Sequence, residues 1–317
     1  MDASHVRAKW RLVLVFAVFG TFLMAPEVRA GNAPGKGDRP DIYDRSADGA
    51  KQIAGALEIA KRDNKRVLLM FGANWCGWCH KMHHLFETDK EIAKTLSYEY
   101  ELTLIDVDKI DDKKHNADID ARYGDPTKQG LPVFVVLDAD GKQLTTQETG
   151  ALETGDHHEP QKVLAFLKKW QPNPLVAGEV LVSGLARAKS ESKNVFLDFS
   201  APWCGWCKKL DAYLRRPKVV EVFDSAFVTV KIDVDRMTGG KAMEVEYRSE
   251  STEGIPFFVL LNADGKRLAD SNGPKGNVGF PVEPFEIDHF MKVIRQTAPR
   301  LKSAQLGVLE NALKAKE

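Results

Sequence analysis

The sequence has little cysteine, no net charge and no long apolar run. Only four cysteines occur in 317 residues. Lysine plus arginine and aspartate plus glutamate number 45 each, so the charge balance indicates neither a nucleic-acid-binding surface nor a polybasic membrane patch. The longest largely apolar run, residues 12–25, is shorter than the roughly 20 residues that a membrane-spanning helix needs. With 43% hydrophobic and 28% charged residues, the chain is expected to fold, and its length favours two domains.

The first thirty residues have the features of an export signal. Three basic residues within positions 7–11 precede the apolar run 12–25, and Val28-Arg29-Ala30 fits a small-residue cleavage site. We expect cleavage before Gly31 and no stable membrane insertion afterwards; an uncleaved N-terminal anchor is the alternative. The mature chain is then expected in an oxidising compartment, periplasmic or secreted.

All four cysteines lie in two copies of the sequence Trp-Cys-Gly-Trp-Cys, at residues 75–79 and 203–207. Each copy follows a short apolar run, 67–71 or 195–199, and precedes residues that read as helix. We therefore expect both pairs at strand-to-helix junctions, where free backbone N–H groups and the helix dipole favour the thiolate of the first cysteine. Because the thiolate is the attacking species, this position indicates redox chemistry.

Two other uses of the cysteines are weaker. A zinc ribbon places its Cys-x-x-Cys pairs about 15–20 residues apart, whereas more than a hundred residues separate these pairs. Structural disulfides are compatible with export, but a bridge within one pair closes a loop of only about four residues and constrains the unfolded chain by roughly 2 kcal/mol.

The order of motifs repeats along the chain. Matching landmarks are offset by 128 residues at the cysteines, by 127 at Asp106 and Asp233, and by 124 at Pro132 and Pro256. This near-constant offset indicates a tandem duplication, with copies of about 130 residues that are large enough to fold alone. The predicted segments are a signal peptide at 1–30, a flexible leader at 31–44, a first domain at 45–170, a linker at 171–176, a second domain at 177–297 and a C-terminal helical tail at 298–317.

Periodicity and turn residues predict the remaining elements. The tail carries apolar residues at helical spacing and is expected to pack back on the second domain. Residues 109–129 read as a charged, turn-rich insert. Helices are expected near 48–64, 77–87, 160–170 and 177–191, and strands near 100–107, 133–137, 227–234 and 257–261.

With Trp-Cys-x-x-Cys after a buried strand and Gly-Leu-Pro or Gly-Ile-Pro before another apolar run, each copy resembles thioredoxin. The resemblance covers roughly residues 45–170 and 177–297. It implies an α/β chain of two tandem thioredoxin-like domains, each with a central mixed sheet flanked by helices. The dipeptide between the cysteines is Gly-Trp rather than the family's usual Gly-Pro, and the motif is most similar to small exported proteins related to periplasmic disulfide reductases.

The resemblance also assigns roles within the sites. It implies that Cys76 and Cys204 are the nucleophiles, and that Cys79 and Cys207 resolve the mixed disulfide. It further implies that the proline of each Gly-x-Pro sequence is cis, faces the disulfide and offers the preceding backbone to an extended substrate segment. The four tryptophans are expected to form apolar rims for a partner. The candidate substrate contacts are Trp75, Trp78, Leu131, Pro132, Trp203, Trp206, Ile255 and Pro256.

The two copies differ at two positions that matter for mechanism. Asp198 stands six residues before Cys204, where the thioredoxin family has an acid that manages the proton of the resolving cysteine, and Lys231 matches its partner lysine. The first copy has Met70 and Leu104 at these places. A buried carboxylate has a raised pKa and can accept the thiol proton. We therefore expect the second domain to exchange faster at neutral pH; the alternative is that the acid is only a hydrogen-bonded polar group.

The first pair has a possible second use. Soft and imidazole ligands that suit Cu(I) or zinc gather near it, but helical spacing directs them to different faces. Surface histidines are the preferred interpretation, and no metal or other cofactor is expected. Histidines 157 and 158 are also expected to be solvated. The ligand candidates are Cys76, Cys79, His80, Met82, His83 and His84.

Together these patterns predict an exported thiol:disulfide oxidoreductase acting on protein disulfides. A reductase or isomerase is preferred over an oxidant because the Gly-Trp dipeptide lacks a histidine that would favour the thiolate strongly. A reductase in an oxidising compartment implies a membrane electron donor. The alternatives are a copper- or metal-binding protein of the same fold and a non-catalytic binding module.

Overall fold

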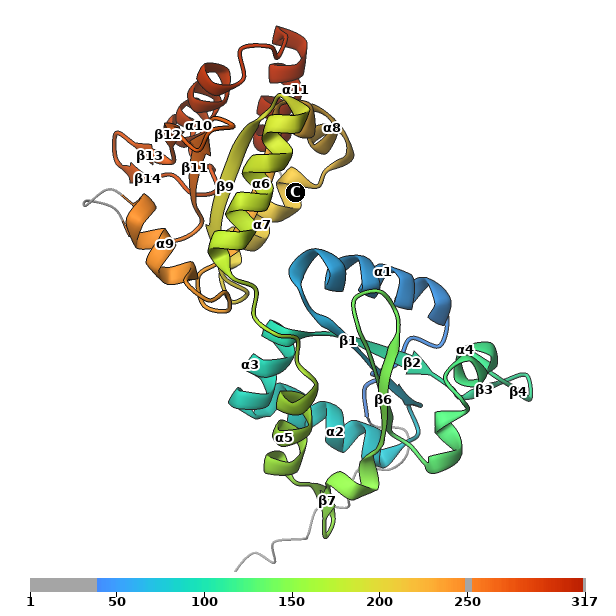
Figure 1. Ribbon diagram of the computed structural model, residues 1–317. Helices are drawn as coiled ribbons and strands as arrows, with labels where there is room; N and C mark the ends of the chain where they lie inside the picture. Colours follow the sequence, from blue (N-terminus) through green and yellow to red (C-terminus); the bar gives the residue numbers. More distant parts are fainter. Residues whose placement is uncertain (1–38, 249–252, 316–317) are drawn as a thin grey trace, which may run out of the picture. The chain divides into compact units, whose positions relative to one another are not determined.

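The computed structural model describes residues 39–248 and 253–315. The signal peptide predicted at 1–30 and most of the leader lie outside the described residues. Two α/β domains make up the described chain (Figure 1). Among the residues described, no helix has the length and apolar content needed to cross a membrane.

The first domain contains two 3-10 helices, at Pro126–Gln129 and Thr149–Leu152, besides its helices and strands. In chain order these are α1 (Gly49–Asp63), β1 (Arg66–Gly72), α2 (Gly77–Thr88), α3 (Lys90–Glu99), β2 (Tyr100–Asp106), β3 (Lys109–Ile110), β4 (Lys113–Lys114), α4 (Ala117–Arg122), β5 (Val133–Leu137), β6 (Gln143–Glu148), β7 (Glu153–Thr154), β8 (His157–His158) and α5 (Pro160–Trp170).

The second domain repeats the main elements and adds a helix at its end. Its elements are α6 (Ala177–Glu191), β9 (Asn194–Ser200), α7 (Gly205–Leu214), α8 (Pro217–Ala226), β10 (Phe227–Asp233), α9 (Gly240–Tyr247), β11 (Phe257–Leu261), β12 (Arg267–Asp270), β13 (Asn272–Gly273), β14 (Gly276–Asn277), α10 (Pro284–Thr297) and α11 (Ser303–Lys314).

Each domain is built on a four-stranded mixed sheet. The strand orders are β2-β1-β5-β6 and β10-β9-β11-β12. In both sheets the strand that leads to the cysteine pair is central: it pairs in parallel with β2 or β10 on one side and antiparallel with β5 or β11 on the other. The predicted fold of two thioredoxin-like domains, each a mixed sheet flanked by helices, is confirmed.

Side chains of the central strand alternate between two buried cores. In β1, Leu68 and Met70 lie in the core with α2, α3 and α5, while Val67, Leu69 and Phe71 lie in the core with α1. The second domain repeats this, with α6 on one face of the sheet and α7, α8 and α10 on the other. Because both faces are covered, the central strands read in the sequence as continuous apolar runs.

Helix ends follow the capping signals of the sequence. The Asp48 side chain accepts the Lys51 backbone N–H at the start of α1, and the helix stops at Asn64, which has a φ of +49°. Helix α11 confirms the predicted packing of the tail: Leu309 is fully buried in the core of the second domain, and its carbonyl accepts the Tyr213 hydroxyl at 3.1 Å.

Candidate active site

In both domains the first cysteine is the N-cap of the helix that follows it. The Cys76 sulfur accepts the backbone N–H of Cys79 at 3.1 Å, and the Cys204 sulfur accepts that of Cys207 at 3.0 Å. Each pair forms a disulfide, and all four side chains are buried. The N-cap sulfur thus lies against the free N–H groups and the positive end of the helix dipole, which favour a thiolate there once the disulfide is reduced.

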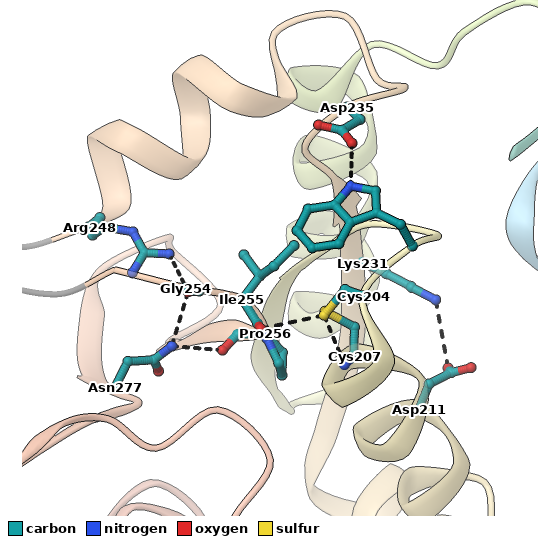
Figure 2. The surroundings of a disulfide bond; sticks show 11 residues. Cys204, Cys207, Asp211, Lys231, Asp235, Arg248, Gly254, Ile255, Pro256 and Asn277 are labelled. Atoms are coloured by element: carbon teal, nitrogen blue, oxygen red, sulfur yellow. Dashed lines mark hydrogen bonds and ion pairs between the residues drawn. A yellow bond between two sulfur atoms is a disulfide. The ribbon is translucent and has the colours of Figure 1, made fainter. Parts of the chain in front are cut away.

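A cis-proline loop faces the second disulfide. Ile255–Pro256 is a cis peptide bond, as is Leu131–Pro132 in the first domain, so the predicted cis prolines are confirmed. The Cys204 sulfur lies 3.4 Å from the Ile255 carbonyl oxygen (Figure 2). The predicted substrate-binding backbone and the predicted nucleophile are therefore adjacent in this site.

Two residues that the sequence reasoning missed hold this loop. The Gly254 carbonyl accepts the guanidinium of Arg248 at 2.8 Å and the side-chain amide of Asn277 at 3.1 Å (Figure 2). The same amide donates to the Pro256 carbonyl at 2.9 Å. Neither Arg248 nor Asn277 belongs to a recognisable sequence motif. Each contacts the loop from another segment of the chain, and the position of that segment is known only from the folded structure.

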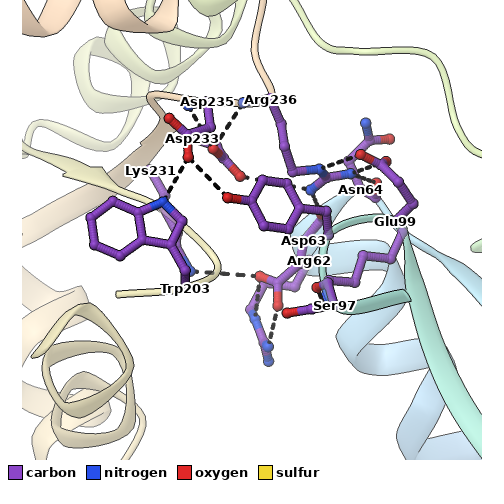
Figure 3. A network of polar contacts seen from close by, with 12 residues as sticks. Arg62, Asp63, Asn64, Ser97, Glu99, Trp203, Lys231, Asp233, Asp235 and Arg236 are labelled. Atoms are coloured by element: carbon purple, nitrogen blue, oxygen red, sulfur yellow. Dashed lines mark hydrogen bonds and ion pairs between the residues drawn. The ribbon is translucent and has the colours of Figure 1, made fainter. Parts of the chain in front are cut away.

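One tryptophan in each site is anchored by its indole N–H while its ring remains open. Trp75 donates to Asp108 at 2.8 Å, and Trp203 donates to Asp235 at 2.7 Å (Figure 3). Their exposed fractions are 54% and 61%. An exposed aromatic face with a fixed orientation suits contact with an apolar part of a partner.

The second tryptophan of the motif is placed differently in the two domains. Trp206 is exposed and stacks near Phe280, with ring centroids 6.4 Å apart. Trp78 is only half-exposed, because the hairpin of β7 and β8 brings the His158 ring edge-on to within 5.1 Å of it. The expectation of a solvated His158 is wrong: the residue is buried, and burial lowers its pKa. In the two-residue strand β8, His157 is exposed and His158 is buried, so the burial depends on which of the two faces Trp78.

Asp198 is buried on β9, and burial raises its pKa to about 7, with the positive charge of Lys231 opposing the shift. Lys231 is its register partner on β10, and the Lys231 ammonium lies 3.9 Å from the Asp211 carboxylate (Figure 2). Asp211 follows Cys207 by one turn of α7, so these groups lie on the sheet face that α7 covers. One Asp198 oxygen has no hydrogen-bond partner among the described residues.

The first domain has no carboxyl at the equivalent place. Met70 is fully buried in one cluster with Cys79, and Leu104 packs against that cluster. The structure thus agrees with the sequence, in which the first copy has apolar residues where the second has Asp198 and Lys231.

The candidate metal ligands of the first site do not converge. His80 lies 2.7 Å from the Asn74 carbonyl oxygen, Met82 is fully buried in the core, and His83 lies 3.5 Å from Glu87. Within residues 39–248 and 253–315, no three His, Cys, Asp or Glu side chains are grouped so that they could hold a metal ion.

Comparison with known proteins agrees with this geometry. A family described as thioredoxin-like domain matches residues 53–167, and one described as thioredoxin-like matches residues 180–263. The chain belongs to the thioredoxin superfamily. Together the two matches span the strand-to-helix junctions of both domains, with their cysteine pairs.

Several relatives are disulfide-exchange proteins. The chain is 27% identical over 202 residues to protein disulfide-isomerase erp38 of Neurospora crassa, covering 63% of this chain and 52% of the relative. It is 34% identical over 110 residues to the thiol:disulfide interchange protein DsbD of Vibrio cholerae, covering 34% of this chain and 17% of the relative. A solved disulphide isomerase from Xylella fastidiosa Temecula1 is 33% identical with a TM-score of 0.36, covering 40% of this chain and 95% of that one. This thioredoxin-like chain thus spans about half the length of the Neurospora relative.

Proposed function

We propose that the protein is an exported thiol:disulfide oxidoreductase that reduces or isomerises protein disulfides at two Cys-x-x-Cys sites. One observation carries this proposal: in each domain a disulfide at a helix N-terminus accompanies a cis-proline loop and an anchored, exposed tryptophan. The two thioredoxin-like family matches and the disulfide-isomerase relatives support thiol-disulfide exchange.

The residues of the second site define the reaction steps. The reduced Cys204 thiolate attacks a substrate disulfide, forms a mixed disulfide and releases one substrate sulfur as thiolate. Cys207 then gives its proton to the Asp198 carboxylate, whose pKa of about 7 suits proton exchange near neutral pH. The Cys207 thiolate attacks Cys204, the second substrate sulfur leaves, and two electrons have passed to the substrate.

Turnover as a reductase needs an electron donor, because each cycle leaves the site oxidised. We propose a membrane reductase as this partner, because a reductase in an oxidising compartment needs a supply of electrons from elsewhere. The reduction potential of each site tests the direction, measured by glutathione titration of variants that keep one cysteine pair. A reduction potential of about −270 mV supports a reductase, and a reduction potential of about −120 mV would make the protein an oxidant.

Two assays test the activity itself. Reduction of insulin by dithiothreitol is expected to accelerate in the presence of the protein, and to remain at the background rate when all four cysteines are serine. Variants with Cys79→Ser and Cys207→Ser are expected to accumulate mixed disulfides with substrate proteins, because the resolving thiol is missing. A protein without effect on insulin would be a binding module instead.

We also propose that the second site exchanges faster than the first at neutral pH. As a general base, Asp198 accelerates the resolving step by about 10² to 10⁴. The first site has Met70 at the place of Asp198 and lacks this contribution. Stopped-flow comparison of a protein that keeps only the first pair with one that keeps only the second is the test. An equal or faster first site would refute this ranking.

Export is proposed from the N-terminal sequence alone. The proposal predicts that the protein fractionates outside the cytoplasm with an N-terminus at Gly31. Cell fractionation followed by N-terminal sequencing is the direct measurement, and a cytoplasmic protein that retains residues 1–30 would contradict it.

A further inference from the structure

Tyr43 reaches the first site from the segment that precedes α1. The side chain of Asn74, in the loop between β1 and the first cysteine pair, fixes this segment. It accepts the backbone N–H groups of Ile42 and Tyr43 at 2.9 and 2.8 Å and donates to the Tyr43 carbonyl at 2.9 Å. The Tyr43 side chain is 2% exposed and lies in the same buried cluster as Cys79. The chain is thus attached to the first domain before residue 45, where the sequence placed the boundary of the domain.

Gly72 brings the phenol and the resolving cysteine together. A Cβ atom added at Gly72 would lie 2.1 Å from the Tyr43 hydroxyl oxygen and 2.7 Å from the Cys79 sulfur. The hydroxyl and the sulfur are therefore no further apart than the sum of these two distances. Only a residue without a side chain leaves room for the phenol at this point of β1.

The Tyr43 hydroxyl is buried and has no hydrogen-bond partner among the described residues. A buried hydroxyl without a partner is uncommon because it costs free energy, so its position calls for an explanation. The pKa of Tyr43 is raised far above its usual value, mainly by burial and also by the charge of Asp106. The phenol therefore stays protonated, and stays a donor, over the whole pH range in which a thiol titrates.

The other titratable groups near Cys79 do not provide such a donor. Asp106 is the register partner of Gly72 and faces the same side of the sheet. One of its carboxylate oxygens lies 2.9 Å from Nδ1 of His115, and the other has no hydrogen-bond partner among the described residues. Its pKa is raised by burial. His158 on β8 lies 3.2 Å from the Trp78 carbonyl oxygen. From β1, the cluster with Cys79 contains the apolar side chains Leu68 and Met70.

The second domain has other residues at the places of Gly72, Asn74 and Met70. By the 128-residue offset, Ser200 stands at the place of Gly72, Pro202 at that of Asn74 and the buried acid Asp198 at that of Met70. Tyr43 and Gly72 thus occur in the copy that has Met70 instead of an acid at the place of Asp198.

We propose that the Tyr43 hydroxyl donates a hydrogen bond to the Cys79 thiolate and thereby promotes the resolving step of the first site. In that step the Cys79 thiol loses its proton to solvent, and the thiolate attacks Cys76 of the mixed disulfide. The Cys76–Cys79 bond forms, the bond to the substrate sulfur breaks, and that sulfur leaves as a thiolate. The phenol keeps its own proton throughout. This role rests on the disulfide exchange proposed above.

The test uses the full chain with Cys204→Ser and Cys207→Ser, so that only the first site reacts. The reduced protein is mixed with excess dithiobis(nitrobenzoate), a disulfide of thionitrobenzoate. One thionitrobenzoate is released when Cys76 attacks this reagent, and a second is released when Cys79 resolves the mixed disulfide. The second release is unimolecular, so its rate is independent of reagent concentration, and stopped-flow absorbance follows it from pH 5.5 to pH 10. Tyr43→Phe is compared with this parent.

Tyr43→Phe is expected to slow the unimolecular release at neutral pH by about tenfold and to move its pH dependence up by about one unit, because a hydrogen bond to a charged group favours the thiolate. At high pH, where the thiol ionises without help, the two rates are expected to converge. Tyr123→Phe is the matched control: this buried phenol lies in the core on the α1 side, and its loss is expected to leave the profile unchanged.

Superimposable profiles of Tyr43→Phe and the parent would overturn the inference. A rate that is reduced equally at every pH would also overturn it, because that result indicates loss of packing rather than loss of a donor. Absence of the unimolecular release from the parent itself would instead refute disulfide exchange at the first site, and the role of Tyr43 would fall with it.

Discussion

Replacing Asp198 by asparagine is expected to stabilise the second domain while it slows the reaction. Burial raises the pKa of Asp198 from 3.8 to about 7. Below pH 3.8 the group is protonated in both the folded and the unfolded chain, so it costs nothing. As pH rises from 3.8 to about 7, Asp198 ionises first in the unfolded chain. Above pH 7 it is ionised in both states, and the folded chain carries the full penalty of the buried charge, ~4 kcal/mol. Asparagine has the same shape and never ionises.

The gain in unfolding free energy for Asp198→Asn is therefore expected to be below about 1 kcal/mol at pH 4, to grow up to pH 7 and to be constant near ~4 kcal/mol above it. Native-state hydrogen exchange read by mass spectrometry measures this in the full chain. Peptides from β9 and β10 report on the second domain, and peptides from β1 and β2 are the internal control, since the first domain has Met70 instead. A gain that does not depend on pH, or a loss of stability at pH 8, would refute the reasoning.

Three further changes test packing and anchoring. Gly72→Ala places a Cβ 2.1 Å from the Tyr43 hydroxyl, so calorimetry should show the first domain destabilised by about 1–3 kcal/mol; an unchanged melting temperature would contradict the close approach. Leu309→Ala removes a fully buried side chain of α11 and should lower the unfolding free energy of the second domain by about 2–5 kcal/mol in guanidinium titrations, whereas a loss below about 0.5 kcal/mol would mean that the tail helix is not part of the core. Asp235→Asn weakens the acceptor of the Trp203 indole and should cost about 1 kcal/mol by the same titration; no change would show that the anchor is dispensable.

The fold was predictable because its signals are local and occur twice. The helices at 160–170 and 177–191 and the strands at 133–137 and 257–261 have the predicted bounds in the structure. Buried central strands read as apolar runs, and the near-constant offset between the copies indicates the tandem arrangement before any contact is known. The cysteine pairs at helix N-termini follow from the same local pattern.

The rest of the site depends on contacts that no local pattern encodes. Tyr43 lies 36 residues before Cys79 in the sequence, and only the Asn74 side chain brings its segment to the site. His158 reads as one of several polar residues in a turn, yet the β7–β8 hairpin buries it against Trp78. A signal for Tyr43 was present in the comparison of the copies, because Gly72 and Asn74 depart together from Ser200 and Pro202.

The N-cap role of the first cysteine affects how variants of either site should be made. The Cys76 and Cys204 sulfurs each accept a backbone N–H three residues later, so replacing the cysteine also alters the start of α2 or α7. Serine places an oxygen at this position and is a strong capping residue, whereas alanine removes the acceptor at a cost of about 1 kcal/mol. An alanine variant therefore mixes a lost nucleophile with a frayed helix, and a serine variant separates the chemistry from the architecture that supports it.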